Sequence, residues 1–345
     1  MIAKEQENRP MLIAELSANH GHDISIAKRS ILVAKDAGAD AVKIQTYTAD
    51  TMTIDCDNEY FQVKGGTLWD GRTLYDLYSE AYTPWEWHEE LFDYAKEIGI
   101  ELFSTPFDFS AVDLLESLNV NRYKIASFEI TDIPLIEYAA SKGKPMIIST
   151  GIASLEDIEE AVSACRQKGN DDITLLQCTS QYPADPKDAN LRTMIDMKNR
   201  FEVKVGLSDH TMGNEVAIIA VALGAELIEK HFIMDRAIGG PDASFSITPN
   251  ELKLLSDDIK RTRDILGNVS YDLTEKKKNS RIYARSLFVV KDVKKGDSVT
   301  PENVRSIRPG YGMNPKHYYE IMGRTFLTDV RKGTPLAWGL IGDKE

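Results

Sequence analysis

Two histidines stand at matching positions, each at the end of a segment predicted to be a strand. Segment 203–211 is apolar and β-branched before it ends in SDHT, which contains His210, and segment 227–231 ends in EKH, which contains His231. Ligands of parallel α/β proteins bind at the carboxyl ends of the strands, so both imidazoles would face one opening. They could hold a divalent metal ion that keeps open coordination positions. A separate loop hydrogen bond for each histidine is the alternative, and the pair alone leaves both interpretations open.

Two lysines lie inside otherwise apolar segments. Lys43 stands between Val and Ile, and Lys124 between Tyr and Ile, so both are expected to be buried, which is unfavourable for a cation without an anion nearby. One such lysine could simply pair with a carboxylate of a neighbouring strand. Two of them, with hydroxyl groups at other strand ends, favour a phosphate- or carboxylate-binding site. Glu15 and Glu129 could orient substrate hydroxyls, act as a general base, or be the ionic partners of the lysines.

The polar residues at the carboxyl ends of the predicted strands form the candidate site. An opening lined by these residue types, the mouth, fits an enzyme that polarises a carbonyl group with a metal ion beside a phosphorylated partner. In chain order they are Glu15, Asn19 and His20; Lys43 and Gln45; Ser104 and Thr105; Lys124, Ser127 and Glu129; Ser149 and Thr150; Thr179, Ser180 and Tyr182; Ser208, Asp209 and His210; and Glu229, Lys230 and His231.

Strands that alternate with helices are needed to position these residues. An apolar strand pattern followed by a helical pattern occurs eight times in about 265 residues, which predicts an α/β fold of the (β/α)8 TIM-barrel type. A doubly wound open sheet is the alternative, but it usually has fewer strands, and no glycine-rich dinucleotide fingerprint follows the first strand. The predicted strands are 11–16, 41–46, 101–105, 122–126, 145–150, 173–178, 203–207 and 227–228.

Several helix boundaries carry capping signals. Thr83 is expected to cap a helix that begins at Pro84, and Ser154 to cap a helix over 154–167. A Thr-Pro-Asn-Glu sequence is expected to begin the last barrel helix at 248–266. The stretch 48–81 is expected to be an irregular polar excursion over the mouth.

The pattern changes after residue 266, so we expect three parts. Residues 1–266 would form the catalytic barrel, 267–284 a polar linker, and 285–345 a small loop-rich domain. In that domain we expect a strand at 285–290 and short helices beginning at 301–304 and near Tyr318. Such a small domain buries little core by itself, so we expect it to pack on its own barrel or on a partner.

Composition excludes several classes of partner. The chain has 345 residues, 42% of them hydrophobic, and a formal net charge of −13, which argues against nucleic acid or an anionic membrane surface. The beginning of the chain has no apolar signal core, and no apolar run is long enough to span a membrane. Cys56, Cys165 and Cys178 are scattered. We therefore expect a cytoplasmic protein without a disulfide framework.

The motifs at the strand ends resemble those of the sialic acid synthase family, whose members condense phosphoenolpyruvate with an amino-sugar. The tail from residue 285 resembles the antifreeze-like (SAF) domain that is fused to these synthases, so the likeness covers nearly the whole chain. The motifs are IAE and NH within 13–20, GADAVKIQT at 38–46, STPF at 104–107, YKIAS at 123–127, STG at 149–151, GLSDH at 206–210 and IEKHF at 228–232.

The resemblance implies a role for each residue of the mouth. His210 and His231 would hold a divalent metal cofactor (Mn²⁺, Mg²⁺ or Co²⁺), and Glu15 would lie near the metal and its waters. The residues that would surround phosphoenolpyruvate are Lys43, Thr105, Lys124, Ser127, Ser208 and either Ser149 or Thr150. The residues that would face the sugar are Gln45, Glu129, Tyr182 and Asp242.

A closer likeness, carried by 66–75 and 82–88, is to the pseudaminate-forming members of the family. It implies 2,4-diacetamido-2,4,6-trideoxy-L-altrose as the sugar, with neuraminate or legionaminate synthesis as the alternative because the core motifs are shared. The family likeness also implies a homodimer in which the small domain caps the partner's barrel and Arg308 touches the sugar's acyl group. A solvated strand position for Arg308 is the alternative.

A different class of function is a carbohydrate- or ice-binding module attached to a catalytically silent barrel. Ice binding would require a flat, regular, threonine-rich face. The tail instead carries many charges, and its threonines are scattered at Thr300, Thr325, Thr328 and Thr334. The sequence therefore favours an enzyme.

Overall fold

The computed structural model describes residues 9–64 and 69–343. It consists of two compact units, Met1–Gly267 and Asn268–Glu345. In unit 1 eight parallel strands pair in chain order, and β8 returns to pair with β1, which confirms the predicted TIM barrel. The strands are β1 (Met11–Glu15), β2 (Ala41–Thr46), β3 (Glu101–Pro106), β4 (Tyr123–Ile125), β5 (Met146–Ser149), β6 (Ile173–Cys178), β7 (Lys204–Asp209) and β8 (Leu227–His231).

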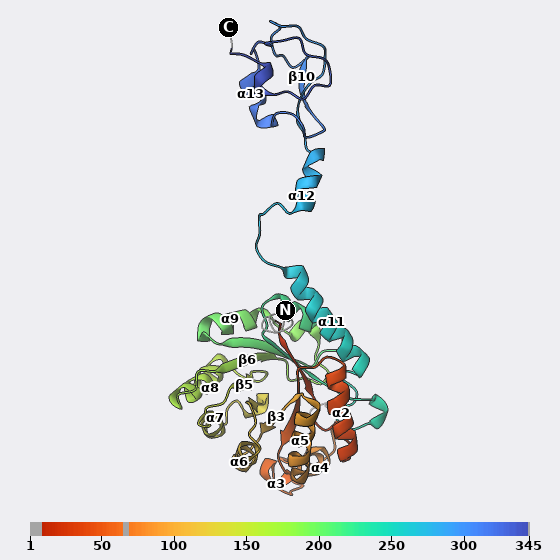
Figure 1. Cartoon of the computed structure of the whole chain (residues 1–345). Helices are drawn as coiled ribbons and strands as arrows, with labels where there is room; N and C mark the ends of the chain where they lie inside the picture. Colours follow the sequence, from red (N-terminus) through yellow and green to blue (C-terminus); the bar gives the residue numbers. More distant parts are fainter. Residues whose placement is uncertain (1–8, 65–68, 344–345) are drawn as a thin grey trace. The chain divides into compact units, whose positions relative to one another are not determined.

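Helices lie around the outside of these strands (Figure 1). A central cluster of apolar residues between strands and helices makes up most of the core. The helices of unit 1 include α2 (Ile24–Asp36), α3 (Ala49–Met52), α4 (Leu74–Ala81), α5 (His88–Ile98), α6 (Phe109–Ser117), α7 (Ile133–Ala140), α8 (Leu155–Gln167), α9 (Arg192–Phe201), α10 (Glu215–Ala222) and α11 (Pro249–Leu266), with 3₁₀ helices η1 (Trp85–Trp87), η2 (Ser127–Glu129), η3 (Pro186–Asp188) and η4 (Arg236–Ile238).

A layer of apolar side chains fills the barrel interior below the mouth. Ile13, Phe103 and Leu176 are buried members of this layer. Side chains two residues apart on a strand point to the same face, so Ile13 and Glu15 both face inward. The packed layer makes the barrel a closed core rather than a pore, and the inward residues beyond it form the floor of the mouth.

Side-chain caps define several helix starts as the sequence predicts. Ser154 and Asp157 form a reciprocal capping box at α8, and Thr248 and Glu251 form another at α11. Each box satisfies backbone N–H groups that have no partner inside the helix. These caps fix where the strand-to-helix loops end.

The structure corrects two of the expectations for the region before α5. Thr83 does not cap a helix, because the 3₁₀ turn η1 comes first and α5 begins only at His88. The Thr83 hydroxyl instead lies 3.4 Å from Nε2 of His20. The excursion at 48–81 is also more regular than expected, since it contains α3 and α4, capped by the side chains of Thr48 and Thr73.

Unit 2 has its own small core. Its elements are α12 (Glu275–Ser280), the 3₁₀ helices η5 (Arg281–Tyr283), η6 (Pro315–His317) and η7 (Trp338–Leu340), α13 (Tyr318–Ile321), and the strands β9 (Ser286–Val289) and β10 (Val304–Ile307). The two strands pair antiparallel, and apolar residues including Leu287, Val304 and Phe326 are buried beneath them. The helix expected to begin at 301–304 is wrong, because a turn leads there directly into β10. Short α12 lies within the stretch expected to be a linker.

Across both described ranges, the model contains no helix that combines the length and the apolar character needed to cross a membrane.

Candidate active site at the carboxyl end of the barrel

Strand register brings the charged residues of the mouth to one level. Glu15 on β1 is the register partner of Lys43 on β2 and of His231 on β8. Ser208 on β7 is the partner of Glu229 on β8. Because Glu229 and His231 are two residues apart, both face the mouth. Side chains from far-apart parts of the sequence thus meet at the carboxyl ends of the strands, as expected.

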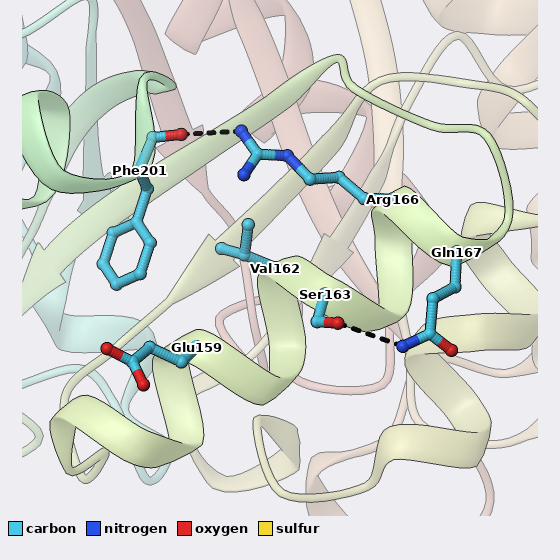
Figure 2. Close-up of a pocket in the computed structure, with 6 residues that line it drawn as sticks. All are labelled: Glu159, Val162, Ser163, Arg166, Gln167 and Phe201. Carbon is cyan, nitrogen blue, oxygen red and sulfur yellow. Dashed lines mark hydrogen bonds between the residues drawn. The ribbon is translucent and has the colours of Figure 1, made fainter.

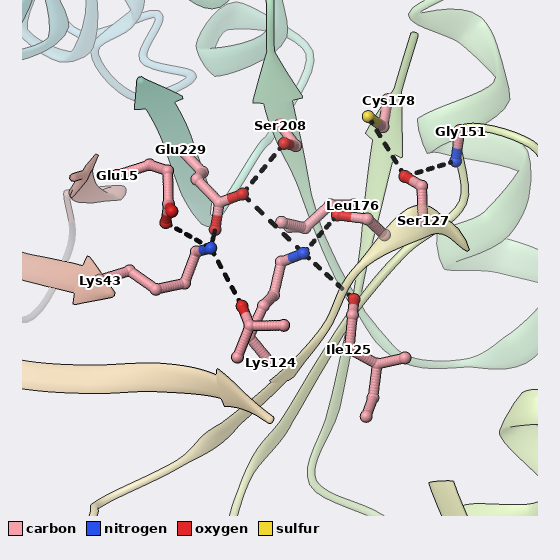
Figure 3. A network of polar contacts seen from close by, with 12 residues as sticks. Glu15, Lys43, Lys124, Ile125, Ser127, Gly151, Leu176, Cys178, Ser208 and Glu229 are labelled. Atoms are coloured by element: carbon pink, nitrogen blue, oxygen red, sulfur yellow. Dashed lines mark hydrogen bonds and ion pairs between the residues drawn. The ribbon is translucent and has the colours of Figure 1, made fainter. Parts of the chain in front are cut away.

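Lys43 is buried among oxygen atoms from three strands. Its amine forms an ion pair with Glu15, lies 3.1 Å from Oγ1 of Thr105 and lies 3.8 Å from Oε2 of Glu229. Figure 3 shows the Lys43 amine between the carboxylates of Glu15 and Glu229. The carboxylate partners considered from sequence are therefore present, and they explain how the cation is tolerated in the barrel.

Lys124 approaches the same carboxylate from the other side. Its Nζ donates to Oγ of Ser149 at 2.7 Å. It also donates to the Ile125 carbonyl oxygen at 3.1 Å and lies 3.8 Å from Oε1 of Glu229 (Figure 3). Lys124 is only 2% exposed. Unlike Lys43, it has no carboxylate oxygen within hydrogen-bond distance among the described residues, so it has more capacity to bind an incoming anion.

Glu229 lies between the two lysines, and the charges of these groups affect one another's pKa values. Burial opposes ionisation of its carboxyl group, but the charges of Lys124 and Lys43 and the hydroxyl of Ser208 outweigh burial and lower its pKa. Burial lowers the pKa of the Lys124 amine, and Glu229 offsets this effect only in part. A bound anion would therefore stabilise the charged form of Lys124.

The hydroxyl groups of the mouth have different hydrogen-bond partners. Ser149 contacts Lys124, whereas the Thr150 hydroxyl donates to the Leu176 carbonyl oxygen at 3.0 Å. The structure therefore favours Ser149 over Thr150 as the hydroxyl beside the cation. The Oγ atom of Ser127 accepts a hydrogen bond from the backbone N–H of Gly151 at 3.2 Å.

The two histidines lie side by side, with ring centroids 5.2 Å apart. Nδ1 of His210 lies 3.0 Å from the carbonyl oxygen of Thr179. A carbonyl can only accept, so Nδ1 carries the proton, and in the neutral ring Nε2 keeps its lone pair. A hydrogen bond of this kind, from the far nitrogen of the ring to a backbone carbonyl, is typical of imidazoles that bind metals. His231 has a buried Nδ1 without a hydrogen-bond partner among the described residues, and burial with the nearby His210 holds its pKa well below the usual value.

These two imidazoles are suited to bind a divalent cation in a site that has few protein ligands. Within 9–64 and 69–343, no three His, Cys, Asp or Glu side chains are grouped so that they could enclose a metal ion. Two nitrogen donors would leave several coordination positions for water or substrate, which suits a catalytic rather than a structural ion. Asp242 lies nearby, with its Oδ2 3.8 Å from Nδ1 of His231 and 2.5 Å from Oγ of Ser17.

An aromatic wall stands beside the histidines. The Tyr182 ring lies 4.4 Å from that of His210, 5.2 Å from that of Phe245 and 5.8 Å from that of Trp69, centroid to centroid. Trp69 also donates from its indole nitrogen to the Pro241 carbonyl oxygen at 3.3 Å. The excursion after β2 thus reaches the loop after β8 and helps to enclose the mouth.

Gln45 and Glu129 complete the set of residues expected to face a sugar. The amide nitrogen of Gln45 donates to Oε1 of Glu15 at 3.2 Å and to Oγ of Ser17 at 3.1 Å. Glu129, at the end of η2, has a buried Oε2 with no hydrogen-bond partner in the described part of the chain. Burial raises the pKa of this carboxyl group to about 7, against the smaller opposing effect of Lys124. A carboxyl group that titrates near neutrality suits proton transfer.

Arg308 is the one predicted site residue that does not belong to unit 1. Arg308 lies in unit 2, directly after β10, and is exposed there. Residues 66–68 of the segment that carried the closer likeness lie outside the described residues. The sequence predicts no role for Ser17 or Phe245. It places Glu229 at a strand end but predicts no function for it. Only Glu229 had a usable signal, because it is two residues before His231 on the same strand.

A hollow of about 450 Å³ away from the strand ends is lined by residues of α8 and by Phe201 at the end of α9 (Figure 2). Arg166 donates there to the Phe201 carbonyl oxygen at 2.6 Å, and Gln167 donates to Ser163 at 3.0 Å. Its side chains come from helices rather than from strand ends, and it lacks the buried lysines and paired histidines of the mouth. The mouth is therefore the better candidate for catalysis.

This barrel and its appended domain match known families. A model of the NeuB family matches residues 30–271, and a model of the SAF domain matches residues 284–341. The chain therefore belongs to the NeuB family and carries a SAF domain near its carboxyl end, which confirms the resemblance seen in the motifs.

Individual relatives cover nearly the whole chain. It is 46% identical to the pseudaminic acid synthase of Helicobacter pylori, over 95% of this chain and 96% of that protein. It is 37% identical to the N,N'-diacetyllegionaminic acid synthase of Legionella pneumophila, over 95% of this chain and 93% of that protein. The crystal structure of an N-acetylneuraminic acid synthetase from Leptospira borgpetersenii, with 35% identity, superimposes with a TM-score of 0.71 over 79% of this chain and 90% of that chain.

Proposed function

We propose that this chain acts as a pseudaminic acid synthase, a transferase that forms a carbon–carbon bond. It condenses phosphoenolpyruvate, 2,4-diacetamido-2,4,6-trideoxy-L-altrose and water to pseudaminic acid and phosphate. The observation that carries the proposal is the pair of buried lysines that share Glu229 in the mouth. The identity of 46% with a pseudaminic acid synthase, against 37% with a legionaminic acid synthase, supports the choice of sugar. Legionaminate and neuraminate synthesis are the alternatives.

Phosphoenolpyruvate binds in the part of the mouth that holds the lysines. Its phosphate and carboxylate groups receive charged hydrogen bonds from Lys43 and Lys124 and neutral ones from surrounding hydroxyls. Charged donors in a site closed off from water stabilise the charge that builds up as phosphate leaves. The proposed hydroxyl donors are Thr105, Ser127, Ser149 and Ser208. Thr150 is not among them, because its hydroxyl already donates to the Leu176 carbonyl oxygen.

His210 and His231 hold the divalent ion in this proposal. The Nε2 lone pair of a neutral His210 ring and the Nδ1 of His231, unpartnered among the described residues, support it. When bound, Mn²⁺, Mg²⁺ or Co²⁺ supplies Lewis acidity toward the aldehyde oxygen of the open-chain sugar. Glu15, the register partner of His231, would add a carboxylate to the side of the mouth that would hold the ion.

The sugar occupies the side of the mouth lined by Gln45, Tyr182 and Asp242, where it is oriented for attack by C3 of phosphoenolpyruvate. Water adds at C2, and the resulting tetrahedral intermediate loses phosphate by C–O cleavage. Glu129 accepts a proton or orients a sugar hydroxyl during these steps, since its carboxyl group titrates near neutral pH.

The proposed assembly is a homodimer in the cytoplasm. The SAF domain of one chain caps the barrel of its partner, and Arg308 contacts the acyl group of the sugar there. The support for this arrangement is the polar stretch 267–284, which lets unit 2 extend away from its own barrel.

A product assay tests the proposed function. The protein is incubated with Mn²⁺, phosphoenolpyruvate and one candidate sugar at a time, phosphate release is followed, and the acid is identified by mass spectrometry. The 6-deoxy diacetamido altrose should give the highest kcat/KM. Equal efficiency with N-acetylmannosamine would overturn the choice of sugar and leave only the family, while no phosphate release with any amino-sugar would favour the binding-module alternative.

A further inference from the structure

The residues directly before the two histidines form a buried ion pair that the reaction does not use. Nζ of Lys230 lies 2.6 Å from Oδ2 of Asp209, and both side chains are 1% exposed. Their Cα atoms are register partners on β7 and β8. Because Ser208 and Glu229 face the mouth, the next residue on each strand faces the opposite side, toward the helices. The pair therefore lies behind the wall of the mouth and cannot touch a substrate.

The same pair holds the backbone directly after His210. Oδ1 of Asp209 accepts hydrogen bonds from the N–H of Thr211 at 2.9 Å and from its hydroxyl at 2.7 Å. Lys230 donates to the carbonyl oxygen of Thr211 at 2.6 Å. Both backbone groups of the residue after His210 are thereby fixed. The loop after β6 is attached at the same place, since the N–H of Ala184 donates to the His210 carbonyl oxygen at 3.0 Å.

Packing alone does not explain two fully buried charges at this position. A buried ion pair loses much of its hydration, and apolar side chains of similar volume often stabilise a fold equally well. What apolar side chains would lack is a directional link between the strands that carry the two histidines. We infer that Asp209 and Lys230 are positioning residues that lock the backbone around His210 and thereby hold its ring in a fixed orientation beside His231.

The inference deepens the proposed function, because it rests on His210 and His231 as the metal ligands. It predicts that loss of the pair weakens Mn²⁺ binding by about 10- to 100-fold, as is typical when groups behind metal ligands are removed. It also predicts that the ring of His210 no longer keeps a single tautomer in the protein without metal. Neither effect is expected from a pair that only stabilises the fold.

The main test variant is the double substitution Asp209→Asn with Lys230→Met. It leaves no unpaired buried charge, so it should fold, and the introduced amide oxygen can still accept a hydrogen bond from Thr211. The matched control is Glu101→Gln with Arg122→Met, which removes a two-bond ion pair between β3 and the residue before β4, at the amino end of the barrel. Lys230→Arg, which keeps the charge, should retain most of the Mn²⁺ affinity.

Two measurements decide the inference. Calorimetry gives the Mn²⁺ affinity, and nitrogen NMR of histidine-labelled protein without metal gives the tautomers, with His210 and His231 assigned through His→Gln variants. The double variant should show weaker binding and averaged His210 signals, and the control should match wild type. Wild-type affinity within twofold and unchanged His210 signals in the double variant would overturn the inference. If wild type itself does not bind Mn²⁺, the metal part of the proposed function fails, and the His210 signals alone decide about the pair.

Discussion

At the scale of single residues, the mouth is a nearly balanced set of buried charges. Lys43 and Lys124 face Glu15 and Glu229, so each lysine is tolerated without a ligand yet remains able to bind an anion. The two interpretations of these lysines that the sequence left open are therefore compatible. The carboxylates explain how the lysines are buried, and the incomplete pairing of Lys124 explains how an anion could be favoured.

Lys124→Met should reduce kcat/KM for phosphoenolpyruvate by more than tenfold, and Lys43→Met should do the same. A hydrogen bond to a charged group contributes about 1.5–3 kcal/mol, which corresponds to at least that change in rate. Steady-state kinetics with phosphate detection measures the effect. Lys144→Met serves as the control, because Lys144 also pairs with a carboxylate, Glu116 at 2.9 Å, but before β5 begins. Wild-type kinetics in either mouth variant would make that lysine purely structural.

Removing either histidine ligand should abolish turnover while the fold is kept. His210→Ala or His231→Ala deletes one of two proposed nitrogen donors, and residues of a barrel mouth contribute little to the core. Circular dichroism checks the fold and a phosphate-release assay checks activity. A chelator should abolish the activity of the wild-type protein, and added Mn²⁺ should restore that activity. Full activity after thorough chelation would show that no metal ion is needed.

Glu129→Gln should make the protein more stable at pH 8 but not at pH 4. In the folded protein this carboxyl group has a pKa of about 7, raised by burial from the ordinary value of 4.5. The folded state thus binds the proton more tightly, so wild type loses stability as pH rises from about 4.5 through 7, up to roughly 3 kcal/mol. Gln stays neutral and avoids this loss. Thermal melting of both proteins at several pH values measures this effect. The difference between the two melting temperatures should grow over this pH range and stay constant outside it.

The same substitution should change the pH dependence of catalysis. If Glu129 acts in its ionised form, kcat of wild type rises with pH around 7, and the Gln variant loses this rise along with most of its activity. An unchanged pH profile in the variant would assign Glu129 a structural role only.

At the scale of elements, the strands were predictable and the mouth loops were not. Buried strands such as β1 and β5 are marked by short apolar runs, and the regular repetition of such strands with helices specifies the barrel. The polar stretch 48–81 has no such period, so α3 and α4 were not predicted although Thr48 and Thr73 are good helix caps. The position of Phe245 beside Tyr182 depends on loop packing, for which no local sequence signal exists.

The excursion after β2 should determine which sugar is used. Trp69 packs near Tyr182 and contacts the loop after β8 through Pro241. An aromatic wall suits a sugar that has a methyl group in place of the 6-hydroxyl. Trp69→Ala should therefore reduce kcat/KM for the 6-deoxy diacetamido sugar at least tenfold, with a much smaller effect on the KM for phosphoenolpyruvate. Trp85→Ala is a matched control, since Trp85 donates to the Tyr47 carbonyl oxygen at 3.0 Å on another part of the same region. Equal losses for both substrates would argue for general disruption instead.

At the scale of the whole molecule, the chain consists of a NeuB-family barrel followed by a SAF domain, each with its own hydrophobic core. The residues of the mouth could be predicted because strand ends of a parallel barrel converge by geometry alone. No comparable rule connects Arg308 to the mouth, since it follows β10 in unit 2. Its role in the proposed function depends on assembly, which must be measured in the intact protein.

A mixing experiment tests whether Arg308 serves the barrel of the partner subunit. Arg308→Ala and His210→Ala should each be inactive alone, the first for lack of the contact with the sugar and the second for lack of a metal ligand. If capping occurs between subunits, a mixed dimer contains one barrel with an intact His210 that receives Arg308 from the other chain. Activity should therefore appear when subunits exchange, with one of the two barrels in each mixed dimer active. If Arg308 serves its own barrel, no barrel of a mixed dimer has both residues, and activity stays absent although differently tagged subunits are shown to exchange.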